Sequence, residues 1–141
     1  AVVSGADAAL RRAGKYADGW LGIWCSSQRY ADSIAIFNRA AEEADRHVQA
    51  DHGIQLWVGV GKDRAEAASF VGPAMEGFYQ VPFDKFARYT PHGTVDDIVD
   101  FLAPYLEAGC RHFNLTPVAS TAETGIEAIA EVGERLRRMT D

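Results

Sequence analysis

The residue types best suited to chemistry gather at the start of the chain, in Ser4-Gly5-Ala6. Residues 1–4 predict a short apolar strand, and residues 6–17 predict a helix. A small-residue turn between a strand and a helix leaves room for a ligand, and the first helical turn presents unpaired N–H groups with positive partial charge. This arrangement favours phosphate binding. The next strand, over residues 18–24, would bring an aromatic edge beside the same turn.

The periodicity of apolar residues predicts the elements that position this turn. Strands are expected over residues 1–4, 20–24, 53–60 and 111–115, and helices over residues 6–17, 32–48, 94–107 and 122–138, with a further helix opening at residue 63. Strands that alternate with helices along the chain predict an α/β fold with a parallel sheet and right-handed crossovers.

Local signals indicate where the helices begin and which faces they bury. Asp32 or Ser33 is expected to cap the second helix, and Asp63 with Glu66 resembles a capping box. In the last helix the inward residues are expected to be Ile126, Ile129, Ala130, Gly133 and Leu136.

Residues 77–93 are aromatic, contain two prolines and show no regular period. A long irregular segment in a compact domain is usually functional or mobile. We therefore favour an interface or a substrate-side loop over a plain linker.

Other chemical motifs are incomplete. Residues 59–63, GVGKD, lack the earlier glycine of a phosphate loop, and Asp63 stands where that motif has Ser or Thr. The four histidines lack the spacing of metal ligands, so no metal site is predicted. His112 and Asn114 share one face of the last strand. They either line an interior as a polar pair or, as we favour, His112 is a hydrogen-bonded core histidine.

Composition and charge narrow the classes of function. A chain of 141 residues can bury a real core. Its formal net charge of -6 argues against a nucleic-acid partner. No apolar run approaches the roughly 20 residues of a membrane helix and no signal segment is visible, so we expect a cytoplasmic protein. Cys25 and Cys110 are expected to be reduced, partly buried thiols rather than a redox pair.

Two blocks of the sequence resemble a known enzyme family. The early block SGADAALRRAGKYADGWLG is similar to the family segment AALRRAARYADGWL, which follows a strand and a small-residue turn. The later block GTVDDIVDFLAPYLEAGCRHFNL is similar to the family segment GTPEEVAERLAAYVEAGARHFVL. With both blocks in this order and spacing, the chain resembles the luciferase-like flavin-dependent monooxygenases, which use FMN or a deazaflavin coenzyme.

The resemblance implies a fold and a set of partners. Family members are (β/α)8 TIM barrels, so we expect residues 1–141 to form a single partial domain, the C-terminal half of a barrel with about four parallel strands. The opening within a strand agrees with this expectation. The whole protein would be an oxidoreductase or monooxygenase of a small-molecule substrate, and we expect this stretch alone to be inactive. Because a half barrel exposes sheet edges and core, the missing N-terminal half or another copy of the chain is the expected partner, and neither nucleic acid nor a membrane is expected.

The resemblance also implies a cofactor site. The flavin phosphate would lie, mostly through backbone N–H groups, on the turn formed by Ser4, Gly5, Ala6 and Asp7. The end of the next strand would approach the flavin through Ile23, Trp24 and Cys25. These three residues lack the hydroxyl or basic group that often assists the phosphate there, so Ser26 or Ser27 is the alternative. The carboxylate of Asp7 would repel a phosphate unless it points away, and the catalytic residues are expected largely in the absent half.

Two other hypotheses stay open. One is a non-catalytic half barrel that acts as a binding module through its exposed edges and its aromatic segment. The other is a self-contained small α/β module that binds an unrelated phosphate ligand, which only the general form of the turn supports.

Overall fold

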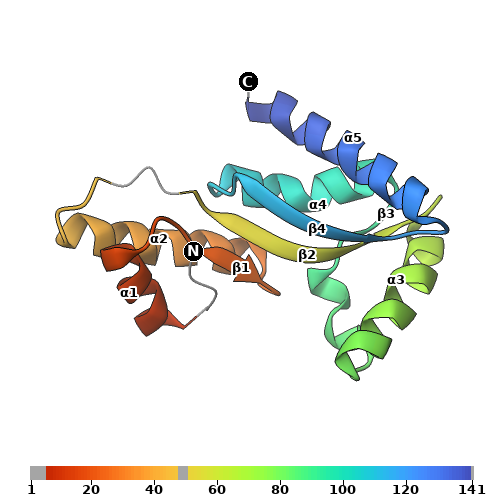
Figure 1. Ribbon diagram of the computed structural model, residues 1–141, viewed down its shortest axis with the longest axis horizontal. Coiled ribbons are helices and arrows are strands. Elements are labelled where there is room, and N and C mark those ends of the chain that lie inside the picture. Colours follow the sequence, from red (N-terminus) through yellow and green to blue (C-terminus); the bar gives the residue numbers. More distant parts are fainter. Residues whose placement is uncertain (1–5, 48–50, 141) are drawn as a thin grey trace. The chain divides into compact units, whose positions relative to one another are not determined.

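The computed structural model describes residues 6–47 and 51–140, arranged as helices and strands that alternate along the chain (Figure 1). The elements are α1 (Asp7–Tyr16), β1 (Leu21–Ile23), α2 (Ser27–Glu43), β2 (Gly53–Val60), α3 (Arg64–Tyr79), two 3-10 turns (Phe83–Lys85 and Ala87–Tyr89), β3 (His92–Gly93), α4 (Val95–Glu107), β4 (His112–Val118) and α5 (Ala122–Thr140). The strand expected over residues 1–4 lies outside the described residues.

Strand β2 is the one to which the other strands pair. Its start pairs in parallel with β1, where Leu21 lies opposite Gly53. Its end pairs in parallel with β3, where Gly59 lies opposite His92. Strand β4 also pairs with β2, which completes a four-stranded sheet. The α/β fold with a parallel sheet is therefore confirmed.

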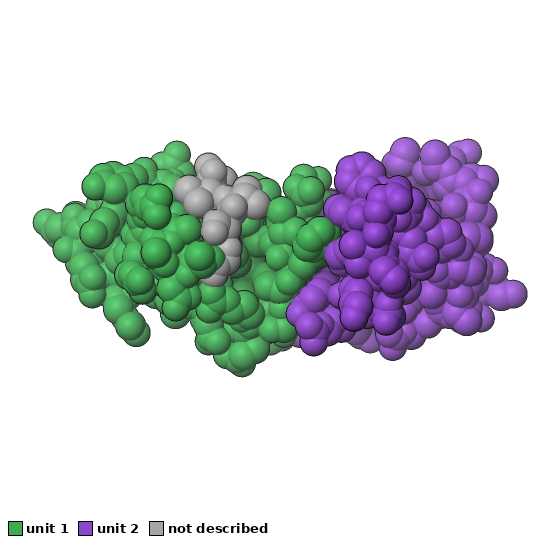
Figure 2. All heavy atoms as spheres, turned by 90° about the horizontal axis from the view of Figure 1, so that it is seen from below, with its two compact units in different colours: residues 1–55, 105–114 green, residues 56–104, 115–141 purple. Residues whose placement is uncertain are grey.

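The chain divides into two compact units, which Figure 2 shows in different colours. Unit 1 consists of residues 1–55 and 105–114, and unit 2 consists of residues 56–104 and 115–141. Strand β2 contributes residues 53–55 to unit 1 and residues 56–60 to unit 2. Each unit has its own buried side chains and is described separately below.

The core of unit 1 is rich in aromatic rings. Helix α1 packs on α2, and Gly14 allows the close approach because a Cβ there would collide with the backbone oxygen of Phe37. The largest fully buried side chains of this unit are Leu10, Trp20, Tyr30, Phe37 and Ile54. Burial of such side chains contributes much of the free energy that stabilises unit 1.

The core of unit 2 is aliphatic, and it corrects the predicted face of the last helix. The buried residues of α5 are Gly125, Ala128, Val132 and Leu136, whereas Ile126 is 64% exposed. Of the expected inward residues only Leu136 is buried. A Cβ at Gly125 would lie 3.2 Å from Pro117 of β4, so the helix turns its small residues toward the strand. Close packing against β4 decides this face, although isoleucine is the larger apolar side chain.

Helix α2 begins five residues earlier than residue 32, where the sequence pattern placed its start. Its cap is Ser26, whose Oγ accepts the N–H of Arg29 at 3.1 Å, and neither Asp32 nor Ser33 caps it. The start of the helix escapes the apolar-periodicity criterion because its first three residues, Ser27 to Arg29, are polar. The helix also ends at Glu43, before residue 48.

The cap expected at the start of α3 is confirmed at Asp63, but the reciprocal bond of a capping box goes to the residue before the cap. The carboxylate of Asp63 accepts the N–H of Glu66 at 2.8 Å, and the Glu66 carboxylate accepts the N–H of Lys62 at 3.1 Å. The segment from residue 77 is more ordered than its irregular sequence indicated, because α3 continues to Tyr79 and two 3-10 turns follow. Among the described helices, none has the length and apolar character needed to cross a bilayer.

Candidate functional site

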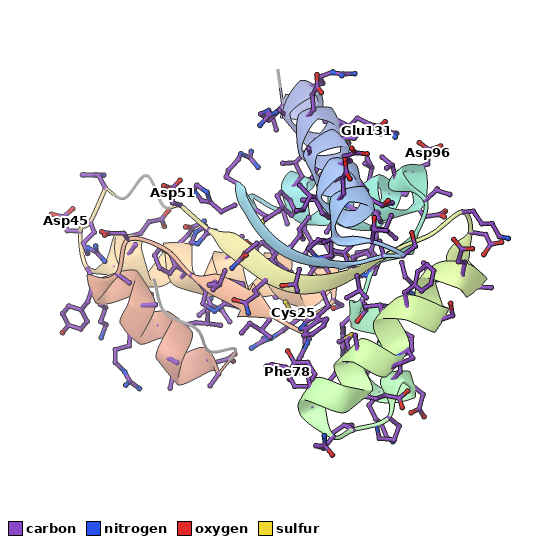
Figure 3. All side chains as sticks on the ribbon, turned by 45° about the vertical axis from the view of Figure 1, so that its right-hand side comes forward. Cys25, Asp45, Asp51, Phe78, Asp96 and Glu131 are labelled. Atoms are coloured by element: carbon purple, nitrogen blue, oxygen red, sulfur yellow. The ribbon has the colours of Figure 1, made fainter. Side chains whose placement is uncertain are left out.

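The described residues of the predicted site lie at two turns of unit 1. Ser4 and Gly5 fall outside the described residues. Ala6 is the cap residue of α1, and Asp7 is the first residue of that helix. At the other turn Ile23 is the last residue of β1, and Trp24 and Cys25 lead into α2; Figure 3 labels Cys25 there.

An ion pair joins the two turns. Nη2 of Arg29 lies 2.9 Å from Oδ1 of Asp7. Asp7 opens α1, and Arg29 is in the first turn of α2, so the N-terminal ends of two helices come together. Both side chains stay accessible, with exposed fractions of 40% for Arg29 and 55% for Asp7. The ion pair therefore lies at the surface, where a ligand can reach it.

The two helix ends differ in how their N–H groups are satisfied. Ser26 caps α2 through its hydroxyl group. Ala6 has no side chain that could cap α1, and the first intrahelical bond of that helix runs from Leu10 N–H to the Ala6 carbonyl. The first turn of α1 therefore carries positive partial charge without a side-chain acceptor at its cap position. An anion could take the place of the missing cap.

The positive charge of Arg29 offsets the repulsion that the Asp7 carboxylate would exert on a phosphate. A carboxylate beside an incoming phosphate repels it, but a guanidinium 2.9 Å away balances that charge. Arg29 is a basic residue four positions after Cys25, close to the turn where Ile23, Trp24 and Cys25 offer none. The sequence pattern missed Arg29, because it placed the start of this helix at residue 32 and left Arg29 in the preceding loop.

The backbone between β1 and α2 is held in an unusual conformation. Trp24 has φ of 48°, in the left-handed region that a bulky residue rarely adopts. The next residue is held in place by Tyr105, whose hydroxyl group donates to the Cys25 carbonyl at 2.6 Å. Strained backbone of this kind persists only where surrounding contacts over-determine it, and it is concentrated at functional sites.

Aromatic side chains connect this turn to the core of unit 1. The ring of Tyr30 lies between those of Trp20 and Tyr105, with centroid separations of 5.1 Å and 5.6 Å. The Tyr30 hydroxyl group donates to the Gly53 carbonyl at 3.0 Å, which ties α2 to the start of β2. Burial raises the pKa of Tyr30 well above its usual value, so it acts as a neutral donor.

The two cysteines are free thiols, as expected. Burial raises the pKa of Cys25 to about 11, and burial also raises the pKa of Cys110. Because the thiolate is the reactive form of cysteine, both side chains stay protonated and unreactive near neutral pH. Neither thiol is therefore suited to act as a nucleophile at this site.

The histidine predicted for the core is the wrong one. His112 is exposed, with Nε2 3.2 Å from Oδ1 of Asp51, and Asn114 is also exposed. The buried histidine is His52, whose Nδ1 accepts the N–H of Trp20 at 3.1 Å. Its position just before β2 gave no periodic signal. Among the described residues no group of three potential metal ligands occurs.

Comparison with known proteins gives the fold its context. No protein-family model and no curated protein sequence matches this chain. Solved structures do match: an F420-dependent secondary alcohol dehydrogenase superposes with a TM-score of 0.76 at 19% identity, covering 92% of this chain and 46% of that one. The coenzyme F420-dependent tetrahydromethanopterin reductase of Methanopyrus kandleri gives a TM-score of 0.69 at 15% identity, covering 92% of this chain and 48% of that one.

A monooxygenase from Streptomyces bottropensis also matches, with a TM-score of 0.73 at 13% identity over 99% of this chain and 47% of that one. The chain thus spans about half the length of each of these three structures. At such low identities the likeness concerns the fold. This chain has an α/β fold equivalent to half a (β/α)8 barrel, and it shares this fold with two F420-dependent enzymes and a monooxygenase.

Proposed function

We propose that this chain is the part of a luciferase-like flavin- or deazaflavin-dependent oxidoreductase, or monooxygenase, that holds the phosphate of the cofactor. The observation that carries the proposal is the Arg29–Asp7 ion pair, which joins the N-terminal ends of α1 and α2. The fold shared with F420-dependent enzymes and a monooxygenase supports the choice of cofactor class.

In this proposal the chain's own residues bind and orient the cofactor. The backbone N–H groups at Ala6 and Asp7, with Ser4 and Gly5 before them, donate to the phosphate. Arg29 adds charge-assisted hydrogen bonds. The turn of Ile23, Trp24 and Cys25 forms the edge that faces the flavin. When bound, the flavin supplies reactivity toward oxygen, or the deazaflavin supplies a hydride.

The remaining parts of the enzyme belong to the proposal as well. The binding site for a small-molecule substrate and the acid–base groups that act on it would be completed by a further half barrel, because this chain spans about half of its structural neighbours. That half would be a separate segment or a second copy of this chain. The further half barrel would cover the exposed face of β4, which carries His112, Asn114 and Thr116.

The decisive test compares FMN with riboflavin, which lacks the phosphate. Each is titrated into the chain and into the Arg29→Gln variant, with quenching of flavin fluorescence as the readout. We expect Arg29→Gln to weaken FMN binding about tenfold, because a charge-assisted hydrogen bond is lost, and to leave riboflavin binding unchanged. Arg39→Gln is the matched control, because Arg39 is an exposed residue of the same helix.

Two outcomes contradict the proposal. If Arg29→Gln and Arg39→Gln weaken FMN binding equally, the effect is general electrostatics and not a phosphate site. If the unaltered chain binds neither FMN nor a deazaflavin phosphate at millimolar concentration, it does not hold the cofactor phosphate. The second result would favour the non-catalytic binding module.

A further inference from the structure

Unit 2 contains a charged cavity that plays no part in the site described above. Its volume is about 370 Å³. Charged and aromatic side chains from four segments line it: Arg64 from α3, Arg88 from the second 3-10 turn, His92 from β3, and Asp97, Asp100 and Phe101 from α4. A cavity of this size holds a small molecule rather than a few waters.

The two arginines of this cavity make no direct ion pair with a carboxylate among the described residues, although Arg64 lies close enough to Asp97 to lower the pKa of that carboxyl group. Among residues 6–47 and 51–140, neither Arg64 nor Arg88 forms an ion pair or a side-chain hydrogen bond. The guanidinium of Arg88 instead lies 4.6 Å from the ring centre of Tyr89, which limits its freedom. Two arginines from different segments that line one cavity, with no direct ion pair to occupy their guanidinium groups, are suited to bind an oxyanion in a forked geometry.

The Asp97 carboxylate, which also lines the cavity, is already hydrogen-bonded at the start of its own helix. Oδ2 of Asp97 accepts the N–H of Thr94 at 2.9 Å and lies 3.1 Å from the Thr94 hydroxyl oxygen. The N–H bond from Thr94 is the main cause that lowers the pKa of Asp97, with smaller contributions from Arg64 and His92. Thr94 therefore caps α4 while the Asp97 carboxylate bonds back to the Thr94 N–H, and Asp100 is the only other carboxylate among the described residues that line the cavity.

The floor of the cavity is fixed by buried groups. Thr90 is 1% exposed, and its hydroxyl group donates to the Phe86 carbonyl at 2.9 Å. Nδ1 of His92 lies 2.7 Å from the Thr90 carbonyl and must carry a proton to donate to it. These bonds hold the segment between Arg88 and β3 in one conformation, so the cavity is largely formed before a ligand arrives.

We propose that this cavity binds a small ligand through one oxyanion group, a carboxylate or a phosphate-type group, held between Arg64 and Arg88. Phe101 provides an apolar wall for the remainder of the ligand. The proposal does not rest on the proposed function, because both arginines and the cavity belong to unit 2 and the phosphate turn belongs to unit 1.

The test uses two probe anions on the full 141-residue chain. Sodium sulfate is a tetrahedral dianion, and sodium acetate is a planar monoanion; each is titrated at constant ionic strength against sodium chloride, because salt screens nonspecific attraction. Amide NMR shifts of Thr90, His92, Gly93 and Phe101 report on the cavity. Saturating shifts of these amides support the proposal, and the tighter probe tells whether the ligand group is phosphate-like or a carboxylate.

Three variants separate a forked site from a general positive potential. We expect Arg64→Gln and Arg88→Gln each to weaken the preferred anion about tenfold, since each removes a charge-assisted contact. Lys62→Gln is the matched control, because it removes the same charge two residues from Arg64 at a side chain that is 76% exposed. It should leave the affinity unchanged.

The Asp100→Asn variant tests whether anion affinity rises when a negative charge is removed from the cavity, which a merely structural role of Asp100 would not cause. Removing a carboxylate from the cavity should strengthen sulfate binding severalfold, because a like charge is lost. The proposal is overturned if neither anion shifts the four amides, if Lys62→Gln weakens binding as much as Arg88→Gln, or if Asp100→Asn weakens sulfate binding. Circular dichroism of each variant verifies that its fold is intact.

Discussion

Burial determines how readily the imidazole ring of His52 takes up a proton. It is 4% exposed, and its ring meets that of Phe37 edge-on at 4.7 Å. Nδ1 accepts the N–H of Trp20, so the neutral ring carries its proton on Nε2, which has no hydrogen-bond partner among the described residues. Desolvation lowers the pKa of His52, and the nearby Asp51 only partly opposes it.

This burial predicts a loss of stability in mild acid. Because the pKa of His52 is lower in the folded state, the unfolded chain binds the proton first, and stability falls as pH drops below the unfolded value of about 6.5. Protonation would also remove the acceptor of the Trp20 N–H. We expect the melting temperature to fall between about pH 7.5 and pH 5.5, and His52→Gln to flatten this fall. Exposed His47→Gln is the control, and an unchanged pH profile in His52→Gln would contradict the assignment.

At the scale of elements, helix α2 shows how a polar first turn positions function. Ser26 caps the helix, and Arg29 two residues into it contacts Asp7 of α1. A serine further along has a different role. Ser33 is fully buried, and its hydroxyl group has no hydrogen-bond partner among the described residues. An unpartnered buried hydroxyl group destabilises the fold rather than supporting it.

These two serines give opposite predictions for the same substitution. Ser26→Ala should lower the free energy of unfolding by about 0.5–2 kcal/mol, because the Arg29 N–H loses its cap. Ser33→Ala should leave that free energy unchanged or raise it, because an unsatisfied hydroxyl group is removed. Urea melts followed by circular dichroism measure both. A larger loss in Ser33→Ala than in Ser26→Ala would mean that the helix begins where the sequence pattern placed it, near residue 33.

At the scale of the whole molecule, several large apolar side chains are exposed. Phe78, labelled on α3 in Figure 3, is 71% exposed, and Ile126 on α5 is 64% exposed. The chain also spans 46% and 48% of two F420-dependent structures with the same fold. A partial barrel leaves sheet edges and core surface uncovered, which favours association with another protein surface.

We therefore predict that the purified chain associates. Its mass by sedimentation at micromolar concentration should exceed the 15.4 kDa of a single chain, and Ile126→Gln should weaken the association. Ala130→Gln, at an exposed residue on the same helix, is the control. A mass of one chain at every concentration would contradict the expected oligomer and leave the separate half barrel as the remaining partner.

Local patterns were enough to predict much of the fold. Strand β2 was predicted from its alternating apolar residues over residues 53–60, and the cap of α3 was predicted at Asp63. Helix α1 was predicted to within one residue at each end. These features depend on groups a few residues apart, whose geometry the backbone dictates directly.

The sequence by itself determined the α/β class and most elements, whereas the turn expected to bind an anion stays a prediction. Only the tertiary structure decided which distant groups meet. Arg29 reaches Asp7 across 22 residues of sequence, His52 rather than His112 is buried, and α5 turns Gly125 and Val132 inward in place of Ile126. Apolar period and residue type are local properties, whereas an ion pair, a desolvated ring or a buried helix face depends on the path of the whole backbone.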